Sequence, residues 1–147
     1  MTSTRIASTF QAIHQRGRPG LIPFLTVGFP TVEATLRLVP ALEAAGADLV
    51  ELGVPFSDPI ADGPTIQRAS ARSLEAGTTL RAALDLVEAL RGEAEIPLVL
   101  MTYFNPIFAF GEREFVEEAL RVGVDGVIST LTGVPVDREI AMTGEVT

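Results

Sequence analysis

Cysteine and lysine are both absent from this chain of 147 residues, and all 11 basic residues are arginine. Without cysteine, the chain can build neither a disulfide framework nor a thiolate metal site, and a cytoplasmic location fits this composition. The formal net charge is −8, and the arginines are scattered along the chain rather than gathered in a basic stripe. The composition therefore argues against a nucleic-acid partner and against an acidic membrane surface.

Long apolar runs are also missing. The longest one, residues 96–110, contains Asn105 and is interrupted by Pro97 and Pro106. Such a segment is too short and too interrupted to span a bilayer, so we expect no membrane association. The N-terminal region has an early Arg5 but no continuous apolar core, and we expect no signal peptide.

Aromatic residues are scarce, at 6% of the chain, whereas 47% of the residues are hydrophobic. The length is sufficient for one domain with a real core. The composition is typical of a globular protein whose sheet is covered on both faces, and it is not that of a disordered tail.

Periodic apolar segments alternate along the chain between helical and strand character. We expect helices over residues 2–16, 31–46, 64–77, 79–92 and 112–123, and buried strands over residues 21–28, 48–54, 96–103 and 124–128. Pro40 should kink the second helix. The alternation predicts a parallel α/β sheet with right-handed crossovers. Two architectures remain open: part of a (βα)8 barrel, of which about four strands are half, or a small open sheet.

The segment ELGVPFSDPIADGP, residues 51–64, places three carboxylates on a stiffened backbone. Glu51 lies near the end of an apolar strand, where a carboxylate is costly unless it is paired or functional. Asp58 and Asp62 follow in a loop that is long for a connection between a strand and a helix. Two carboxylates in different surroundings can divide acid and base work. The alternatives are a buried Glu51 satisfied by backbone donors, and two ordinary turn residues at Asp58 and Asp62.

Three stretches, PFLTVGFP, GADLVELGVPFSDPIADGPTIQRAS and LMTYFNPIFAFG, closely resemble the tryptophan synthase alpha subunit, and the resemblance covers residues 1–128. It implies a partial TIM (βα)8 barrel with about four parallel strands and covering helices. It also implies cleavage of indole-3-glycerol phosphate to indole and glyceraldehyde 3-phosphate, a beta subunit as partner, no cofactor and no metal.

The resemblance also implies roles for individual residues. Glu51 would be the catalytic acid and base, and Asp62 would stabilise the indole N–H as positive charge develops. Phe24 and Tyr103 would line the indole pocket, although both would otherwise be read as core aromatics. The segment expected to touch the beta subunit consists of Pro55, Phe56, Ser57, Asp58 and Pro59.

Residues 129–147 depart from this pattern and resemble instead a short stretch of the proteolytic domain of Lon-type proteases, without its catalytic residues. We therefore expect a foreign-looking tail after an alpha-like half barrel. The chain also lacks the Gly-rich loops that bind substrate phosphate in such barrels. We expect it to be very weak or inactive alone. The alternatives are a non-catalytic half barrel that self-associates through open sheet edges, and a fragment that does not fold cooperatively.

Overall fold

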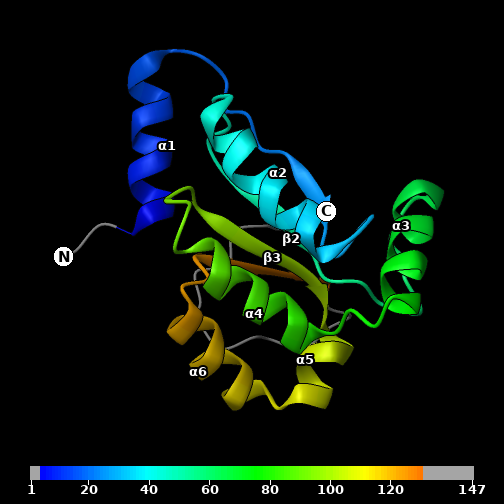
Figure 1. The fold of residues 1–147 in the computed structure, drawn as a ribbon. Helices are drawn as coiled ribbons and strands as arrows, with labels where there is room; N and C mark the ends of the chain where they lie inside the picture. The colour runs from blue at the N-terminus through cyan, green and yellow to red at the C-terminus, as the bar shows by residue number, and fades with distance from the viewer. Residues whose placement is uncertain (1–3, 131–147) are drawn as a thin grey trace.

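The structure, a computed structural model, describes residues 4–130. It contains four parallel strands, which are β1 (Phe24–Thr26), β2 (Val50–Gly53), β3 (Leu98–Tyr103) and β4 (Gly126–Thr130). The helices in this part of the chain are α1 (Arg5–Arg16), α2 (Val32–Ala44), α3 (Pro64–Glu75), α4 (Leu80–Leu90), α5 (Phe104–Phe110) and α6 (Glu112–Val122) (Figure 1). None of these helices is long and apolar enough to cross a membrane.

The strands lie in the sheet in the order in which they occur in the chain, β1-β2-β3-β4. Each new strand is added beside the previous one and on the same side, as in the wall of a barrel. An open doubly wound sheet would instead reverse its strand order near the middle. The predicted parallel α/β sheet is therefore confirmed, and its order is that of a barrel wall rather than of an open sheet.

One face of the sheet is covered by α2, α4 and α6, with α4 packed between the other two (Figure 1). Alternate strand residues such as Val50, Leu52 and Leu100 point to this side and are fully buried. They meet the apolar stripe of α4 and the buried Phe115 of α6. Removing each such side chain from water contributes about 1.5–3 kcal/mol, so this layer holds the core.

The other face carries far less cover among the described residues. Here Ile6 of α1 packs on Leu49 and Val99, and Ile128 is partly buried beside them. Among residues 4–130, α2, α4 and α6 cover one face, and the expectation that the second face is covered as well stays a prediction. In a barrel the second face points to the interior, where side chains of other strands rather than helices provide contacts. The same face therefore accommodates both apolar residues and Glu51.

Side-chain caps fix the starts of α2 and α4, two helices that the sequence predicted from residues 31 and 79. Thr31 accepts a hydrogen bond from the Ala34 N–H at 3.1 Å, and Thr79 accepts one from Ala82 at 3.2 Å. The helix α2 continues through Pro40 without a break, and the predicted kink or local irregularity there stays a prediction. The short helix α5 was not predicted, because its residues belong to a mainly apolar run that contains Asn105 and Pro106 and has no clear helical period.

Ion pairs tie α1 and α4 to the N-terminal end of the sheet. Asp48, just before β2, pairs with Arg16 and accepts the Leu21 N–H at 2.9 Å. Asp125, just before β4, pairs with Arg5 and Arg91. These contacts place α1 across the starts of the strands (Figure 1).

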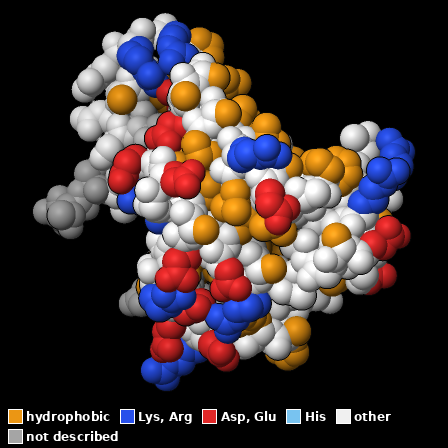
Figure 2. Space-filling view, viewed as in Figure 1, with side chains coloured by type: hydrophobic (Ala, Val, Ile, Leu, Met, Phe, Trp, Pro, Cys, Tyr) orange, Lys and Arg blue, Asp and Glu red, His pale blue; other side chains and the backbone are white. Residues whose placement is uncertain are grey.

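Charged side chains of both signs interleave over α4 and α6 on the face shown in Figure 2. Arg121 bonds Glu88 of α4 at 2.6 Å and Glu118 of its own helix at 2.8 Å. Arg81 of α4 bonds Glu118 at 2.8 Å. Such exposed pairs contribute little to stability, because solvent screens them. This surface is mixed in charge, in agreement with the absence of a basic stripe from the sequence.

Candidate active site

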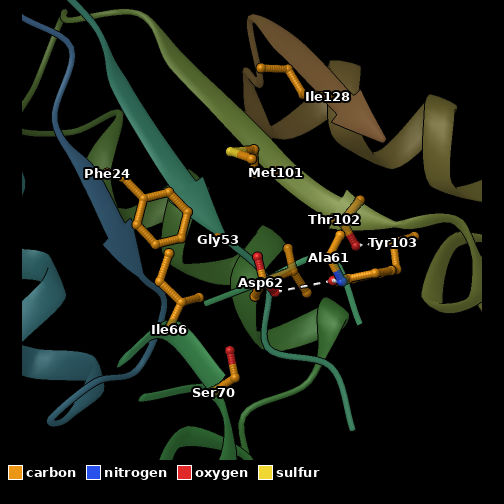
Figure 3. Close-up of a pocket in the computed structure, with 11 residues that line it drawn as sticks. Phe24, Gly53, Ala61, Asp62, Ile66, Ser70, Met101, Thr102, Tyr103 and Ile128 are labelled. Atoms are coloured by element: carbon orange, nitrogen blue, oxygen red, sulfur yellow. Dashed lines mark hydrogen bonds between the residues drawn. The ribbon is translucent and has the colours of Figure 1, made fainter. Parts of the chain in front are cut away.

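A pocket of about 230 Å³ lies at the C-terminal ends of the strands. Its walls come from all four strands, from α3 and from the loop between β2 and α3 (Figure 3). The lining residues are mainly apolar, and they include Phe24, Ile66, Met101 and Ile128, together with the polar Asp62, Ser70, Thr102 and Tyr103. An apolar pocket with a few polar groups at the C-terminal ends of parallel strands is typical of a binding site in barrel proteins.

Asp62 and Tyr103 meet in this pocket although they come from different elements. The Tyr103 hydroxyl donates a hydrogen bond to Asp62 Oδ2 at 3.2 Å, and it accepts the Ala61 N–H at 2.9 Å (Figure 3). Burial is the main reason why the pKa of Tyr103 lies above its ordinary value, so the phenol remains a donor at neutral pH. The hydroxyl thus fixes the loop that carries Asp62 to the end of β3.

Gln67 of α3 holds the same loop from the other side. Its side-chain amide nitrogen donates to the Asp62 carbonyl oxygen at 2.8 Å and to the Pro59 carbonyl oxygen at 3.3 Å. The helix begins at Pro64, a residue suited to the first helical position. Asp62 therefore sits on a turn that is anchored by a strand and by a helix.

Phe24 forms one wall of the pocket because Gly53 lies beside it on the neighbouring strand. A Cβ atom at Gly53 would be 2.4 Å from the Phe24 ring, which is an impossible distance. The glycine therefore permits the aromatic ring to lie across β2. Phe24 is also the register partner of Glu51, so the two side chains share the inner face of the sheet.

Glu51 lies on this inner face between Phe24 and Val99 in register, and it is not among the residues that line the pocket. Its side chain has no hydrogen-bond partner within residues 4–130, so the alternative of a glutamate satisfied by backbone donors finds no support there. Burial raises its pKa above the ordinary value of 4.5. A carboxyl group of this kind holds its proton more readily than a solvated one.

The segment predicted to contact a partner subunit differs in exposure along its length. Pro55 is buried, and the Phe56 ring lies 4.9 Å from the Tyr103 ring, centroid to centroid. Ser57 and Asp58 are exposed and bonded to each other at 2.6 Å, and Pro59 is half-buried. The first two residues thus support the pocket, while the tip of the segment faces solvent.

Several pocket residues were missed by the sequence analysis. Met101 lies two residues before Tyr103 on β3, so the strand period places both on one face and could have identified it. Ile66 and Ser70 follow the helical period of α3, but nothing in the sequence indicated which helix face meets the pocket. Within residues 4–130, no group of three or more acidic or histidine side chains could hold a metal ion.

Comparisons with known proteins agree on one family. A family model described as "Tryptophan synthase alpha chain" matches residues 10–146. The tryptophan synthase alpha chain of Geotalea uraniireducens is 53% identical over 125 residues, which are 85% of this chain and 47% of that protein. The corresponding chain of Aromatoleum aromaticum is 56% identical over 126 residues, 85% of this chain and 46% of that protein. This chain thus spans about half the length of the curated relatives it matches.

Solved structures show the same relationship. Tryptophan synthase subunit alpha from Legionella pneumophila str. Paris is similar with a TM-score of 0.83 and 38% identity, over 86% of this chain and 48% of that chain. A ligand-free tryptophan synthase from M. tuberculosis gives a TM-score of 0.80 and 36% identity, over 86% of this chain and 51% of that chain. The sheet described above therefore corresponds to part of the barrel in these proteins.

The comparisons also bear on residues 129–147. The match of the family model continues to residue 146, beyond the predicted limit near residue 128, and the resemblance to Lon-type proteases is not borne out. Residues 131–147 lie outside the described residues, so a domain boundary at residue 128 stays a prediction. Because the family model matches most of the chain and curated relatives share about half of their aligned residues with it, the chain belongs to the tryptophan synthase alpha chain family.

Proposed function

We propose that this chain carries the indole-recognising half of a site that cleaves indole-3-glycerol phosphate to indole and glyceraldehyde 3-phosphate. The observation that carries the proposal is the Asp62 carboxylate, held by the Tyr103 hydroxyl at the edge of an apolar pocket. Phe24 provides a flat apolar wall in the same pocket. This combination suits a planar aromatic ring that has one N–H donor.

In the proposed reaction, Asp62 accepts the indole N–H. Tyr103 occupies Asp62 Oδ2, which leaves Oδ1 as an acceptor for the ring nitrogen. Positive charge develops on that nitrogen when the ring carbon that bears the glycerol chain is protonated. A prepositioned carboxylate stabilises this charge because it is already oriented before the reaction begins.

Glu51 is the proposed acid and base. Its protonated form gives a proton to the ring carbon, and its carboxylate then takes the proton of the glycerol hydroxyl as the carbon–carbon bond breaks. A pKa raised by burial favours the protonated form that the first step needs. The position of Glu51 beside Phe24 on the inner face supports this role, since a ring against Phe24 would lie above the same strands.

The described residues include no binding site for the phosphate group of the substrate. Barrel enzymes commonly bind phosphate with loops that follow the last two strands. Binding energy from such a remote group normally helps to position the reacting end. We therefore expect the chain alone to release indole very slowly.

A beta subunit is the proposed partner, and the cytoplasm is the proposed location. The exposed tip at Ser57 and Asp58, followed by Ile60 with 88% of its surface exposed, supports a docking role for this loop. A second candidate function is a non-catalytic half barrel that self-associates. It is favoured by β1 and β4, which are edge strands of the described sheet.

Thermal unfolding with and without indole-3-glycerol phosphate tests the proposal. A ligand that binds only the folded state raises the melting temperature, by an amount equivalent to about 2.7 kcal/mol at a hundredfold excess over Kd. We expect a shift in the wild type, no shift in Tyr103→Ala, and a retained shift in Phe108→Ala. Phe108 is the matched control because it is an aromatic residue with 69% exposure that does not line the pocket.

A wild-type melt that does not respond to the substrate would contradict the proposal. If the melt does respond, an indole-release assay follows, and Glu51→Gln should abolish the slow release. Release by the chain alone at the rate of a complete alpha chain would refute the expected weakness. A monodisperse monomer in light scattering would count against the self-associating half barrel.

A further inference from the structure

Ser70 is a buried serine whose side chain reaches the pocket. It lies on α3 with 4% of its surface exposed, and it is one of the residues that line the pocket. Ile66 lies one helical turn before it and lines the same wall. Figure 3 shows the Ser70 hydroxyl directed toward the pocket from the α3 side. The hydroxyl is thus a polar group on an otherwise apolar wall.

No residue between 4 and 130 forms a hydrogen bond with the Ser70 side chain. Serine in a helix often bonds the carbonyl four residues earlier, but this bond is not made here. Ser73, one turn further along α3, behaves differently, because its hydroxyl donates to the Val27 carbonyl oxygen at 2.6 Å. The Ser70 hydroxyl lines the pocket and has no bond to another described residue, so it is available to bond a group that enters the pocket.

Apart from Thr102, whose hydroxyl donates to the Tyr103 carbonyl oxygen, the pocket has two separate polar positions. One is the pair of Asp62 and Tyr103, contributed by the loop and by β3. The other is Ser70, contributed by α3. Phe24, Met101 and other apolar side chains form the remaining walls. Because Asp62 and Ser70 line the same pocket, a planar ligand that gives its ring N–H to Asp62 can present another part of its edge to Ser70.

We infer that Ser70 is a specificity-determining residue that recognises a hydroxyl group on the aromatic ring of a bound indole. The inference rests on the proposed function, because it requires the pocket to take an indole ring. A serine hydroxyl can both donate and accept, and a ring hydroxyl can do the same. A methyl group at the same ring position has similar size but offers no hydrogen bond, so it is the matched comparison.

The test measures dissociation constants by NMR titration of the full chain with indole, with hydroxyindoles, and with the corresponding methylindoles. The substituent is placed in turn at each position of the benzene ring of indole. At one position at least, the wild type should bind the hydroxyindole roughly threefold to tenfold more tightly than the methylindole, the range expected for one hydrogen bond. Ser70→Ala should remove this preference, so that hydroxyindole and methylindole bind about equally well.

Two further variants separate recognition from folding. Ser73→Ala is the same substitution on the same helix, and it should lower the melting temperature without changing the preference for hydroxyl over methyl. Ser70→Thr keeps a hydroxyl and should retain the preference.

The outcomes distinguish the inference from the proposed function. If indole binds but no ring position shows a hydroxyl preference, the inference is overturned while the proposed function stands. A preference that survives in Ser70→Ala overturns it in the same way. If neither indole nor any derivative binds the wild type, both the inference and the proposed function fail.

Discussion

The two ends of the sheet use acidic side chains in opposite ways. At the N-terminal end, Asp48 and Asp125 are each paired with arginine and accept backbone N–H groups. At the C-terminal end, Asp62 is bonded by a neutral phenol, and Glu51 has no partner among the described residues. Barrel proteins generally place stability at the first end and chemistry at the second. The structural carboxylates are thus those paired with arginine, whereas the carboxylates available to a ligand have a neutral partner or none among the described residues.

The pKa values follow the same division. The Leu21 N–H, and then Arg16, hold the pKa of Asp48 below its ordinary value of 3.8, so this group is charged at neutral pH. Burial raises the pKa of Glu51, because its charged form has lost water without gaining a partner. The surroundings of Asp48 favour the charged form of its carboxyl group, and the surroundings of Glu51 favour the neutral form.

Replacing Arg91 by alanine should produce the largest loss of stability. The guanidinium pairs with Asp125 and donates to the carbonyl oxygens of Ile96 at 2.8 Å and Gly123 at 2.9 Å. Its removal leaves the buried Asp125 with less compensation, at a cost of about 3 kcal/mol, because the arginine side chain is still 15% exposed. Urea unfolding measures this difference.

Arg113→Ala is the matched control for Arg91→Ala. Arg113 is 92% exposed and pairs only with Glu117 on its own helix among the described residues, so its removal should change the free energy of unfolding by less than about 1 kcal/mol. Equal effects of the two substitutions would show that the N-terminal end is not where the sheet is stabilised.

Asp48→Asn should have a smaller effect that depends on pH. A carboxyl whose pKa is lowered by folding stabilises the protein above its unfolded pKa, here 3.8, and loses that contribution as the pH falls through the folded value. We expect the variant to be less stable by about 1–3 kcal/mol at neutral pH, with the difference shrinking in acid below 3.8. Unfolding measured over a pH series would contradict this if the difference stayed constant.

Glu51→Gln should have the smallest effect and the opposite sign. A carboxyl whose pKa is raised by folding binds more protons in the folded state, so wild-type stability falls as the pH rises above 4.5. Glutamine does not ionise, and the variant should therefore melt at or slightly above the wild-type temperature at neutral pH. This advantage should disappear below pH 4.5. A variant that is clearly less stable at neutral pH would mean that Glu51 is a structural residue like Asp48.

The sequence predicted those features of the fold that depend on residues close together in the chain. The helices that begin near residues 31, 64 and 79 were predicted from neighbouring residues, and the parallel α/β sheet from the alternation of segments. The bond between Tyr103 and Asp62 joins residues 41 positions apart, so no local pattern could reveal it. Ser70 was not identified from the sequence, because its burial depends on how α3 packs against the strands.

The inner face was the least predictable part of the molecule. Continuously apolar strands are expected whenever both faces are covered, and a barrel interior satisfies that pattern as well as a second helix layer does. The family resemblance indicated Phe24 and Tyr103, but not the contact of Phe24 with Gly53. That contact depends on the register between β1 and β2, which the sequence does not display.

Tyr103 is the single tyrosine of a chain that has no tryptophan. Its phenol is therefore the dominant chromophore in the near ultraviolet, and it is bonded to the loop that carries Asp62. A change in the intrinsic fluorescence of the protein therefore reports on the surroundings of Tyr103 alone. The indole ring absorbs at longer wavelength than a phenol, so a bound indole can be excited selectively and its fluorescence observed without interference from the protein.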